Sequence, residues 1–462
     1  MCSNWNHCPE SAAPVCQSKD TKEEPTANFL RQIILDIQRI RQQKDEIKQA
    51  MLAKGEKETE IVDRVVEVDE TWRNTVHQRD QLRNESNTRA KQIGELMSQG
   101  KKEEAQKVIR QTGEMKQEIK SLEERERELI RQRDELLMKI PNVAHSSVPV
   151  TKDESGNQTI HQWGEVDDAG GNGEGAFKPH WDLVSKNGWI DFERGAKVTS
   201  AGFPFYVGPV ARLQRALIQF FTDKAVEKGY LEIMAPYFVN EDSARGTGQI
   251  PDKEDMMYVI PRDGYFAIPT AEVPVTNFHR DEILKPASLP AKYVCHTPCW
   301  RREAGSHGSE VRGLNRLHQF DKVELVKIVR PETSYEELES LRRDAEELLE
   351  ALELPYRTLL MGTADMGFTQ SKKYDLEVWS PGQKKWLEVS SCSNFEDYQA
   401  RRMKIRCKNE DGKTETVHTL NGSGLALPRV LAAFLETHQQ GDDALTIPPA
   451  LQPWIGADRI EI

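Results

Sequence analysis

Apolar residues recur three and four positions apart along residues 60–140, and the repeat breaks at the glycine-containing stretch Ser98–Lys102. No proline occurs between Pro25 and Pro141. The second half of the repeat runs through Ala105, Val108, Thr112, Met115, Ile119, Leu122, Glu126, Leu129, Arg133, Leu136 and Ile140, and a looser first half runs through Ile61, Val65, Val68, Trp72, Leu82, Ile93 and Leu96. Two such helices joined by a tight turn predict an antiparallel coiled-coil hairpin.

The residues before the hairpin divide into two parts. Residues 1–26 are polar, contain Pro9, Pro14 and Pro25, and have no periodicity, so they are predicted to be a disordered extension. Cys2, Cys8 and Cys16 with His7 match no standard zinc spacing. Residues 28–52 predict a shorter helix that ends at Gly55.

After Pro141 the pattern changes from helical repeats to alternating helices and strands. A loop-rich connector, 146–178, is followed by predicted helices at 211–229, 334–352 and 425–440. Residues 231–239 predict a strand broken by Pro236, and residues 265–273 predict a strand and a turn. Further strands are predicted at 291–303, 318–329, 372–381 and 384–393. Strands joined by hairpins, with helices between them, predict an α+β fold with an antiparallel sheet. Neither of the common glycine-rich phosphate motifs occurs.

Composition narrows the cellular compartments in which the chain is expected. Its 462 residues carry a net charge of −12, with 30% charged and 37% hydrophobic residues. No apolar run approaches the ~18 residues that span a bilayer, and no secretory or mitochondrial leader is apparent. Seven cysteines without a regular framework fit a reducing compartment. These features favour a cytoplasmic protein without a membrane partner.

Residues 299–320 concentrate arginines and glycines between two apolar runs. Arg301 and Glu303 are two apart on a predicted strand, so both side chains should point to one face, as should Phe320 and Glu324. A guanidinium, an aromatic ring and carboxylates on one surface suit a nucleotide. The alternative is a set of surface ion pairs that contribute little.

Three further stretches carry candidate chemistry. Thr270, Ala271 and Glu272 place a hydroxyl and a carboxylate in a turn that suits a primary ammonium. LEVSSCSN (387–394) predicts Glu388 and Ser390 on one face of a strand and Ser391 on the other, with a carboxylate available for Mg²⁺. HTLNGSGLALPR (418–429) is interpreted as a glycine-rich strand-to-helix turn suited to phosphate.

Taken in order, these stretches resemble the bacterial-type seryl-tRNA synthetases, which are class II aminoacyl-tRNA synthetases. The resemblance rests on TAEVPVTN, CWRREAGS, RGLNRLHQFDKVELV, LEVSSCSNFEDYQARRMKIR and HTLNGSGLALPRVLAAFLE, and it covers residues 35–462. It implies a class II catalytic domain over 146–462, with an antiparallel sheet flanked by helices, and a tRNA-binding coiled-coil arm over 27–145. It also implies a homodimer, with residues 229–240 at the interface.

The same resemblance assigns roles to residues. Serine would be recognised by Thr270, Ala271, Glu272, Glu324 and Ser423. ATP would be bound by Arg301, Arg302, Glu303, Arg316, Phe320, Glu388, Val389, Ser390, Ser391 and Arg429, although Arg302 is expected to point away from the nucleotide. Arg301 and Arg429 would be catalytic, Glu388 and Ser391 would hold Mg²⁺, and 306–312 would form a mobile loop. Cys295, Cys299 and His296 are expected in the core, without zinc.

The implied reaction is the joining of L-serine to tRNA-Ser, and also to tRNA-Sec, through a seryl-adenylate made from ATP. Without the resemblance, a spacer or dimerisation role for the hairpin would be the simpler interpretation. Two alternatives differ in function: a paralogue that charges another acceptor, which would lack the hairpin, and an inactive tRNA-binding protein, which would lack Arg301, Glu303, Glu324 or Arg429. All of these features are present.

Overall fold

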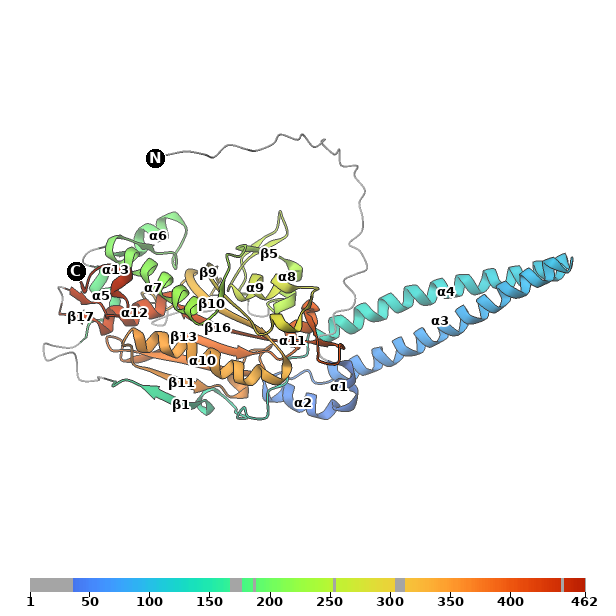
Figure 1. Ribbon diagram of the computed structural model, residues 1–462, viewed down its shortest axis with the longest axis horizontal. Helices are drawn as coiled ribbons and strands as arrows, with labels where there is room; N and C mark the ends of the chain where they lie inside the picture. Colours follow the sequence, from blue (N-terminus) through green and yellow to red (C-terminus); the bar gives the residue numbers. More distant parts are fainter. Residues whose placement is uncertain are drawn as a thin grey trace, which may run out of the picture.

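The computed structural model describes residues 36–166, 177–185, 188–251, 255–303, 312–441 and 444–461. A long two-helix arm projects from one end of a body built around a large sheet (Figure 1). The predicted extension 1–26, with its three cysteines, lies outside the described residues, as does nearly all of the predicted loop 306–312.

The arm consists of α3 (Ile61–Ser98) and α4 (Lys102–Leu137), which pack against each other along their length. The turn lies at the predicted stretch Ser98–Lys102, where Gly100 has a φ of +75°. The sequence-based hairpin is therefore confirmed. The preceding helix differs from the prediction, because its described part is split at Gln43 into α1 (Ile37–Gln42) and α2 (Lys44–Ala53). The break lets apolar residues of both short helices pack into one cluster at the base of the arm.

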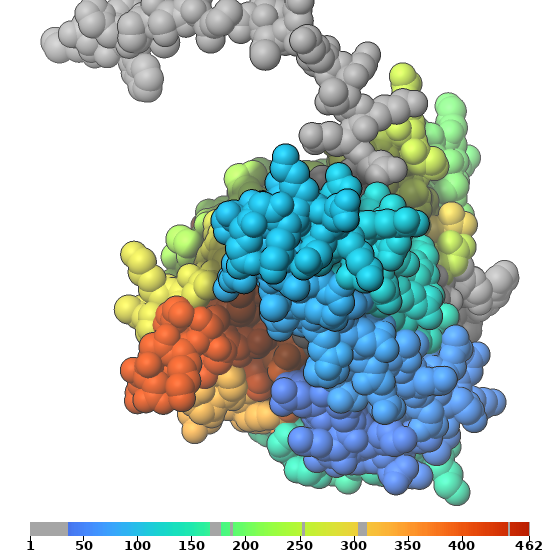
Figure 2. Space-filling model, turned by 90° about the vertical axis from the view of Figure 1, so that its right-hand side faces the viewer, coloured from blue at the N-terminus to red at the C-terminus, as the bar shows by residue number. Residues whose placement is uncertain are grey.

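The base of the arm is anchored to the body by apolar packing and by hydrogen bonds. Ile40, Val62 and Leu137 are fully buried there in a cluster that also contains Tyr398 of the body. The Tyr398 hydroxyl donates to the carbonyl of Ile140 at 2.8 Å. Lys54 donates to the carbonyl of Gln370 at 2.6 Å. Seen end-on, the arm stands in front of the body, with α1 and α2 beside its base (Figure 2).

Two seam positions of the arm hold charges instead of apolar groups. Arg133 lies 3.4 Å from buried Asp69, which also accepts a 2.8 Å hydrogen bond from Arg41. Farther out, Glu126 pairs with Arg79. Buried or half-buried pairs of this kind fix the register of the two helices, since a slip would leave the charges without partners.

The body is organised around an eight-stranded sheet with the order β1-β11-β12-β13-β16-β10-β9-β4. All neighbours are antiparallel except β4 and β9. The strands are β1 (Gln158–Trp163), β11 (Tyr356–Leu360), β12 (Lys372–Ser380), β13 (Lys385–Asn394), β16 (His418–Ala426), β10 (Gln319–Val329), β9 (Ala291–Trp300) and β4 (Leu231–Glu232). The predicted α+β class and the two predicted hairpins, β9–β10 and β12–β13, are confirmed.

The two faces of the sheet have different roles. Val323 and Leu325 of β10 pack into the main core with the helices α7 (Gly208–Glu227), α10 (Ser334–Ala351) and α12 (Leu427–Thr437). Phe320, Lys322 and Glu324 alternate with them and line a pocket on the other face. The period of two along a strand thus separates core from site.

The glycines of HTLNGSGLA lie within the central strand β16, not in a phosphate-binding turn, so that interpretation was wrong. A Cβ on Gly422 would stand 2.9 Å from Cys392 Sγ, and one on Gly424 would stand 3.1 Å from Leu325. Both positions therefore need glycine for close packing against the core. Ser423, between them, faces the pocket.

The remaining elements surround the sheet. The predicted strand 231–239 is broken around Pro236, as predicted, into β4 and β5, and β5 joins a separate three-stranded sheet with β7 and β6. Other elements are α5 (His180–Ser185), β2 (Ile190–Asp191), α6 (Phe192–Val198), β3 (Phe205–Tyr206), β5 (Phe238–Asn240), α8 (Glu241–Thr247), β6 (Val259–Ile260), β7 (Tyr265–Ala267), α9 (Glu272–Thr276), β8 (Ile283–Leu284), α11 (Tyr398–Met403), β14 (Arg406–Lys408), β15 (Thr414–Thr416), β17 (Gln439–Gln440), β18 (Ala444–Thr446), α13 (Gln452–Ile455) and β19 (Arg459–Glu461). Within the described ranges, no helix is both long and apolar enough to cross a membrane.

Candidate active site

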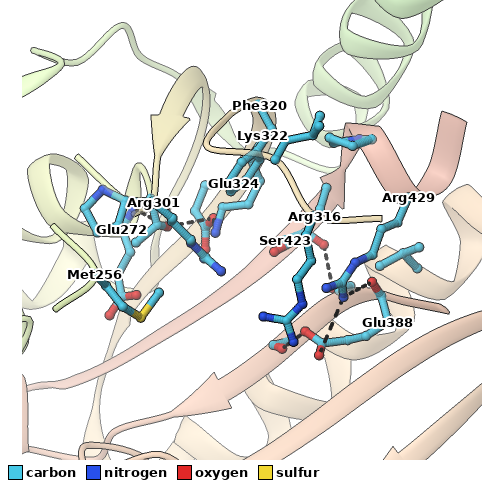
Figure 3. A pocket seen from close by; sticks show the side chains of 18 of the residues that line it. Met256, Glu272, Arg301, Arg316, Phe320, Lys322, Glu324, Glu388, Ser423 and Arg429 are labelled. Carbon is cyan, nitrogen blue, oxygen red and sulfur yellow. Dashed lines mark hydrogen bonds and ion pairs between the residues drawn. The ribbon is translucent and has the colours of Figure 1, made fainter. Parts of the chain in front are cut away.

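A cavity of about 540 Å³ opens on the face of the sheet opposite the core packed by α7, α10 and α12. Residues from β10, β13 and β16 form its floor, and Glu272, Arg301 and Glu324 lie toward one end of it (Figure 3). Arg316, Glu388 and Arg429 lie toward the other end. The cavity therefore has a mainly acidic end and an end rich in arginine.

The acidic end holds two buried carboxylates beside a hydroxyl. Glu272 is 7% exposed and Glu324 is 1% exposed. The Thr270 hydroxyl donates to Glu324 Oε2 at 3.1 Å and accepts from the Glu272 backbone N–H at 3.2 Å. The turn at 270–272 thus places the Thr270 hydroxyl next to both Glu272 and Glu324. The sequence predicted that Thr270 and Glu272 share this turn.

Burial determines the electrostatics of this end. Burial, and then repulsion from Glu324, raises the pKa of Glu272 to about 7. Burial also raises the pKa of Glu324, while Lys322 and the Thr270 hydroxyl oppose the rise. A cationic ligand placed between the two carboxylates would relieve their repulsion, so the chemistry of this end suits an ammonium group.

Sequence reasoning missed three polar residues at this end. Lys322 pairs with Glu324, and Asn421 donates to the other oxygen of the same carboxylate at 3.2 Å. Gln399 donates to Glu272 Oε1 at 2.6 Å. Lys322 was detectable, because it is two residues from Glu324 on one strand and so shares its face. Gln399 lies 127 residues from Glu272, and no local pattern connects them.

The expected nucleotide residues also converge on the cavity, but not by the predicted route. Strand β9 ends at Trp300, and Arg301 and Glu303 follow it in irregular backbone, with a φ of +49° at Glu303. The prediction that both lie on the strand was therefore wrong. Arg301 instead stacks with its guanidinium 5.3 Å from the Phe320 ring, and Arg316, in the turn before β10, pairs with Glu303 at 3.1 Å.

The prediction that Glu388 and Ser391 point to opposite faces was also wrong. The register between β12 and β13 shifts at Val389, so that Glu388 pairs with Glu377 and Ser390 with Leu376. A bulge of this kind re-aims the following side chains. As a result, the Ser391 hydroxyl donates to Glu388 Oε1 at 3.1 Å, and Ser390 instead donates to the Ser423 carbonyl at 2.7 Å.

Glu388 and Ser391 supply oxygen donors of the kind that Mg²⁺ prefers. Although burial opposes the charged form, Lys373 and Arg429 lower the pKa of Glu388 and so keep it ionised. Magnesium is commonly held by one or two carboxylates together with substrate phosphates, so this small donor set fits an ion that arrives with a nucleotide. Across the described ranges, no group of three or more His, Cys, Asp or Glu residues could hold a metal by itself.

Arg429 closes this end of the cavity from the start of α12. Its Nε donates to the Asn315 carbonyl at 3.0 Å, and Nη1 donates to the Glu388 carbonyl at 2.9 Å. Pro428 occupies the first turn of the helix, as predicted, where its missing N–H is not needed. The short helix start therefore places the guanidinium between two segments of backbone.

Two predicted site residues do not line the cavity. Arg302 pairs with Asp255 at 3.2 Å, and Ala271 is fully buried in the packing behind the 270–272 turn. Val389, Ser390 and Ser423 do line it. Cys295 and Cys299 are buried in the core as expected, whereas His296 lies on the opposite face of β9 and contacts Asp321 at 2.9 Å.

Two family models match the chain. Residues 34–144 match the seryl-tRNA synthetase N-terminal domain, and residues 258–438 match the tRNA synthetase class II core domain (G, H, P, S and T). The serine--tRNA ligase of Salinibacter ruber is 54% identical over 432 residues, which cover 92% of this chain and 99% of the relative. The chain belongs to the seryl-tRNA synthetase family.

Solved seryl-tRNA synthetases agree with this assignment. The seryl-tRNA synthetase of Pyrococcus horikoshii, complexed with ATP, is 36% identical, with a TM-score of 0.86 over 92% of this chain and 99% of its own. The cytoplasmic serine-tRNA ligase of Naegleria fowleri, in complex with AMP, is 26% identical, with a TM-score of 0.83 over 93% and 99%. The resemblance seen in the sequence motifs is therefore confirmed, including the arm that distinguishes seryl-tRNA synthetases.

Proposed function

We propose that this chain is a serine–tRNA ligase that activates L-serine with ATP and transfers the seryl group to the 3′ end of tRNA-Ser. The observation that carries the proposal is the cavity with two unlike ends, one formed by Glu272 and Glu324 and the other by Arg316 and Arg429. Serine offers an ammonium group for the first end, and the ATP phosphates offer anions for the second.

Recognition of serine follows from the polar groups at the acidic end. The carboxylates of Glu272 and Glu324 receive the ammonium, and Thr270, Ser423 and Asn421 offer hydrogen bonds to the remaining polar atoms. A site built to pair a hydroxyl group rejects alanine strongly, because its buried polar groups would be left without partners.

Activation joins the two ends. The serine carboxylate attacks the α-phosphorus of ATP, the bond to the β-phosphate oxygen breaks, and seryl-adenylate and pyrophosphate result. Arg301 stabilises charge at the α-phosphate, Phe320 stacks on adenine with Glu303 beside its amino group, and Arg429 binds the departing phosphates. Glu388 and Ser391 would hold Mg²⁺ with ATP, where the ion neutralises phosphate charge.

In the second step a hydroxyl of the tRNA terminal ribose attacks the seryl carbonyl, and AMP leaves. The arm binds the tRNA at a distance from the pocket. Along α4, Lys116, Lys120 and Arg127 are exposed and share one helical face. Gly113, one turn before Lys116, has open space where a Cβ would stand. These three cations, with a small residue beside them, suit contact with the phosphate backbone of tRNA-Ser and of tRNA-Sec.

An exposed apolar surface supports a homodimer. Met234 is 89% exposed, and Leu231, Phe238, Tyr265 and Phe278 are all between 48% and 60% exposed. They cluster in and around 229–240, where β4 is also the terminal strand of the large sheet. A second copy would cover both the apolar side chains and the strand edge. Replacing Met234 and Phe238 with Lys and measuring the mass in solution tests this, since an unchanged mass contradicts it.

Serine-dependent exchange of pyrophosphate with ATP tests the activation step, and charging of tRNA-Ser tests the transfer. A paralogue that charges another acceptor would pass the first assay and fail the second. An inactive tRNA-binding protein would fail both while retaining tRNA affinity.

A further inference from the structure

A buried histidine–glutamate pair lies behind the arginine end of the pocket and outside its lining. His180 begins α5, Glu436 lies near the end of α12, and both are fully buried. The His180 backbone N–H and Nδ1–H donate to Glu436 Oε1 at 3.0 and 2.8 Å. None of the substrate chemistry described above uses either residue.

Glu436 is also stabilised as a carboxylate by donors from one further segment, residues 380–383. Ser380 and the Gly382 N–H donate to Oε2, and Gln383 donates to Oε1 at 3.1 Å. Burial opposes the charged form, but the hydrogen bonds from His180 and Ser380 lower the pKa of Glu436. A carboxylate near a helix C-terminus is disfavoured by the helix dipole, so these donors are needed to hold it there.

The other side of the His180 ring holds the segment that leads into β10. The Leu314 N–H donates to His180 Nε2 at 2.9 Å, so Nε2 acts as an acceptor and the proton of the ring lies on Nδ1. Gly313 has a φ of +65°, and a Cβ there would stand 2.3 Å from the same Nε2. The backbone at 313–314 is thus pressed directly against the histidine.

Hydrogen bonds and an ion pair extend from residues 313–316 to the residues expected to bind the nucleotide. Asn315 donates to Gln383 at 2.8 Å, which closes the path back to Glu436, and the Asn315 carbonyl accepts from Arg429 Nε. The next residue, Arg316, pairs with Glu303. One buried network therefore fixes the backbone of residues 314–315. This backbone precedes Arg316 and contacts Arg429, and both arginines face the phosphate end of the pocket.

We propose that His180 and Glu436 are positioning residues for ATP, acting through Leu314 and Asn315 on Arg316 and Arg429. The inference rests on the proposed function for its assay. Preorganised cations bind a phosphate chain more tightly than cations that must be ordered on binding, so loosening the segment weakens ATP binding and slows activation. Among the described residues, none of the hydrogen bonds named for this network reaches Glu272 or Glu324 at the acidic end.

Two variants of His180 test its two ring nitrogens separately, since each variant keeps only one of the two hydrogen bonds that the ring makes. His180→Gln places an amide oxygen near the position of Nε2 and keeps an acceptor for Leu314. His180→Asn keeps a donor near Nδ1 for Glu436 but loses that acceptor. We expect KM for ATP to rise about tenfold in His180→Asn and about threefold or less in His180→Gln, from the loss of one buried hydrogen bond. KM for serine should change less than about twofold in both.

A matched control is His438→Asn. His438, the C-cap residue of α12, is also buried, but it donates from Nε2 to the Leu352 carbonyl, away from the pocket. We expect this variant to lower the melting temperature as His180→Asn does, with KM for ATP unchanged. The inference would be overturned if KM for ATP rose in His180→Asn, His180→Gln and His438→Asn alike, in step with the stability that each variant loses. An unchanged KM for ATP in His180→Asn would also overturn it.

Gln383→Ala provides a second route if a His180 variant does not fold. Gln383 is half-buried in the β12–β13 turn, and its removal cuts the Asn315–Gln383–Glu436 path without opening the core. A rise in KM for ATP supports the inference and no rise contradicts it. If the unmodified chain shows no serine-dependent exchange, the proposed function fails, and equilibrium binding of ATP to the same variants still decides this inference.

Discussion

The arm and the pocket obtain their geometry from different kinds of contact. In the arm, neighbours are near in sequence along each helix, and the two helices meet through a repeat interrupted by one turn. In the pocket, contacts such as Gln399 with Glu272 and Asn421 with Glu324 join residues 127 and 97 positions apart. The arm therefore depends on periodicity, whereas the pocket depends on strand register and on buried charge.

The largest expected effect comes from removing a charge at the acidic end. Glu324→Gln preserves size but loses the carboxylate that faces both Thr270 and Lys322. Loss of one partner of a buried charge pair predicts that serine-dependent exchange falls about 10³-fold. Glu126→Gln in the arm is the matched control: it removes the pair with Arg79 and should leave exchange unchanged. Equal activity of the two variants would contradict the role of Glu324.

Shortening the arm tests whether the two regions work independently. Residues 77–126 can be replaced by a short glycine linker that spares the apolar cluster and the Asp69–Arg133 pair at the base. Charging of tRNA-Ser should fall about 10²-fold or more, because the phosphate contacts are lost, while exchange stays nearly unchanged. A chain that charges tRNA normally without these residues would show that the arm is not the tRNA reader.

The pKa of Glu272 provides a pH test that involves the pocket alone. Because burial raises this pKa to about 7, the free enzyme takes up a proton below that pH, and an ammonium ligand requires its release. We expect KM for serine to rise as pH falls from 8 to 6, and Glu272→Gln to flatten the profile. The same proton favours the folded state over the unfolded chain, so stability without serine should rise as pH falls from 8 toward 5. A profile unchanged in Glu272→Gln would assign the titration to another group.

The smallest expected effects come from replacing one glycine in the arm and one in the sheet, and we expect them to have opposite signs. Gly113→Ala in the arm meets open space and should stabilise the helix by about 1 kcal/mol. Gly422→Ala in β16 forces a Cβ to within 2.9 Å of Cys392 Sγ and should destabilise the body by about 1–3 kcal/mol. Denaturant unfolding of both variants measures the difference. The same sign at both sites would contradict the contrast between local and long-range control.

The same contrast explains which predictions from sequence held. The hairpin and its turn at Ser98–Lys102 were predictable because a repeat of three and four residues is a local signal. Thr270, Glu272 and Glu324 were recognised from their spacing together with the family motifs. The orientation of the Ser391 side chain toward Glu388 could not be predicted, because it results from a bulge at Val389 that depends on pairing with β12. The glycines of β16 were misinterpreted because their neighbours, Leu341 and Cys392, are distant in sequence.

The central claim, that the cavity selects serine and activates it with ATP, is tested most directly by pyrophosphate exchange with each of the twenty amino acids. We predict exchange with serine, with alanine poorer by about 10⁴-fold because the hydroxyl partners would be left unpaired. Exchange with another amino acid and none with serine would contradict the account.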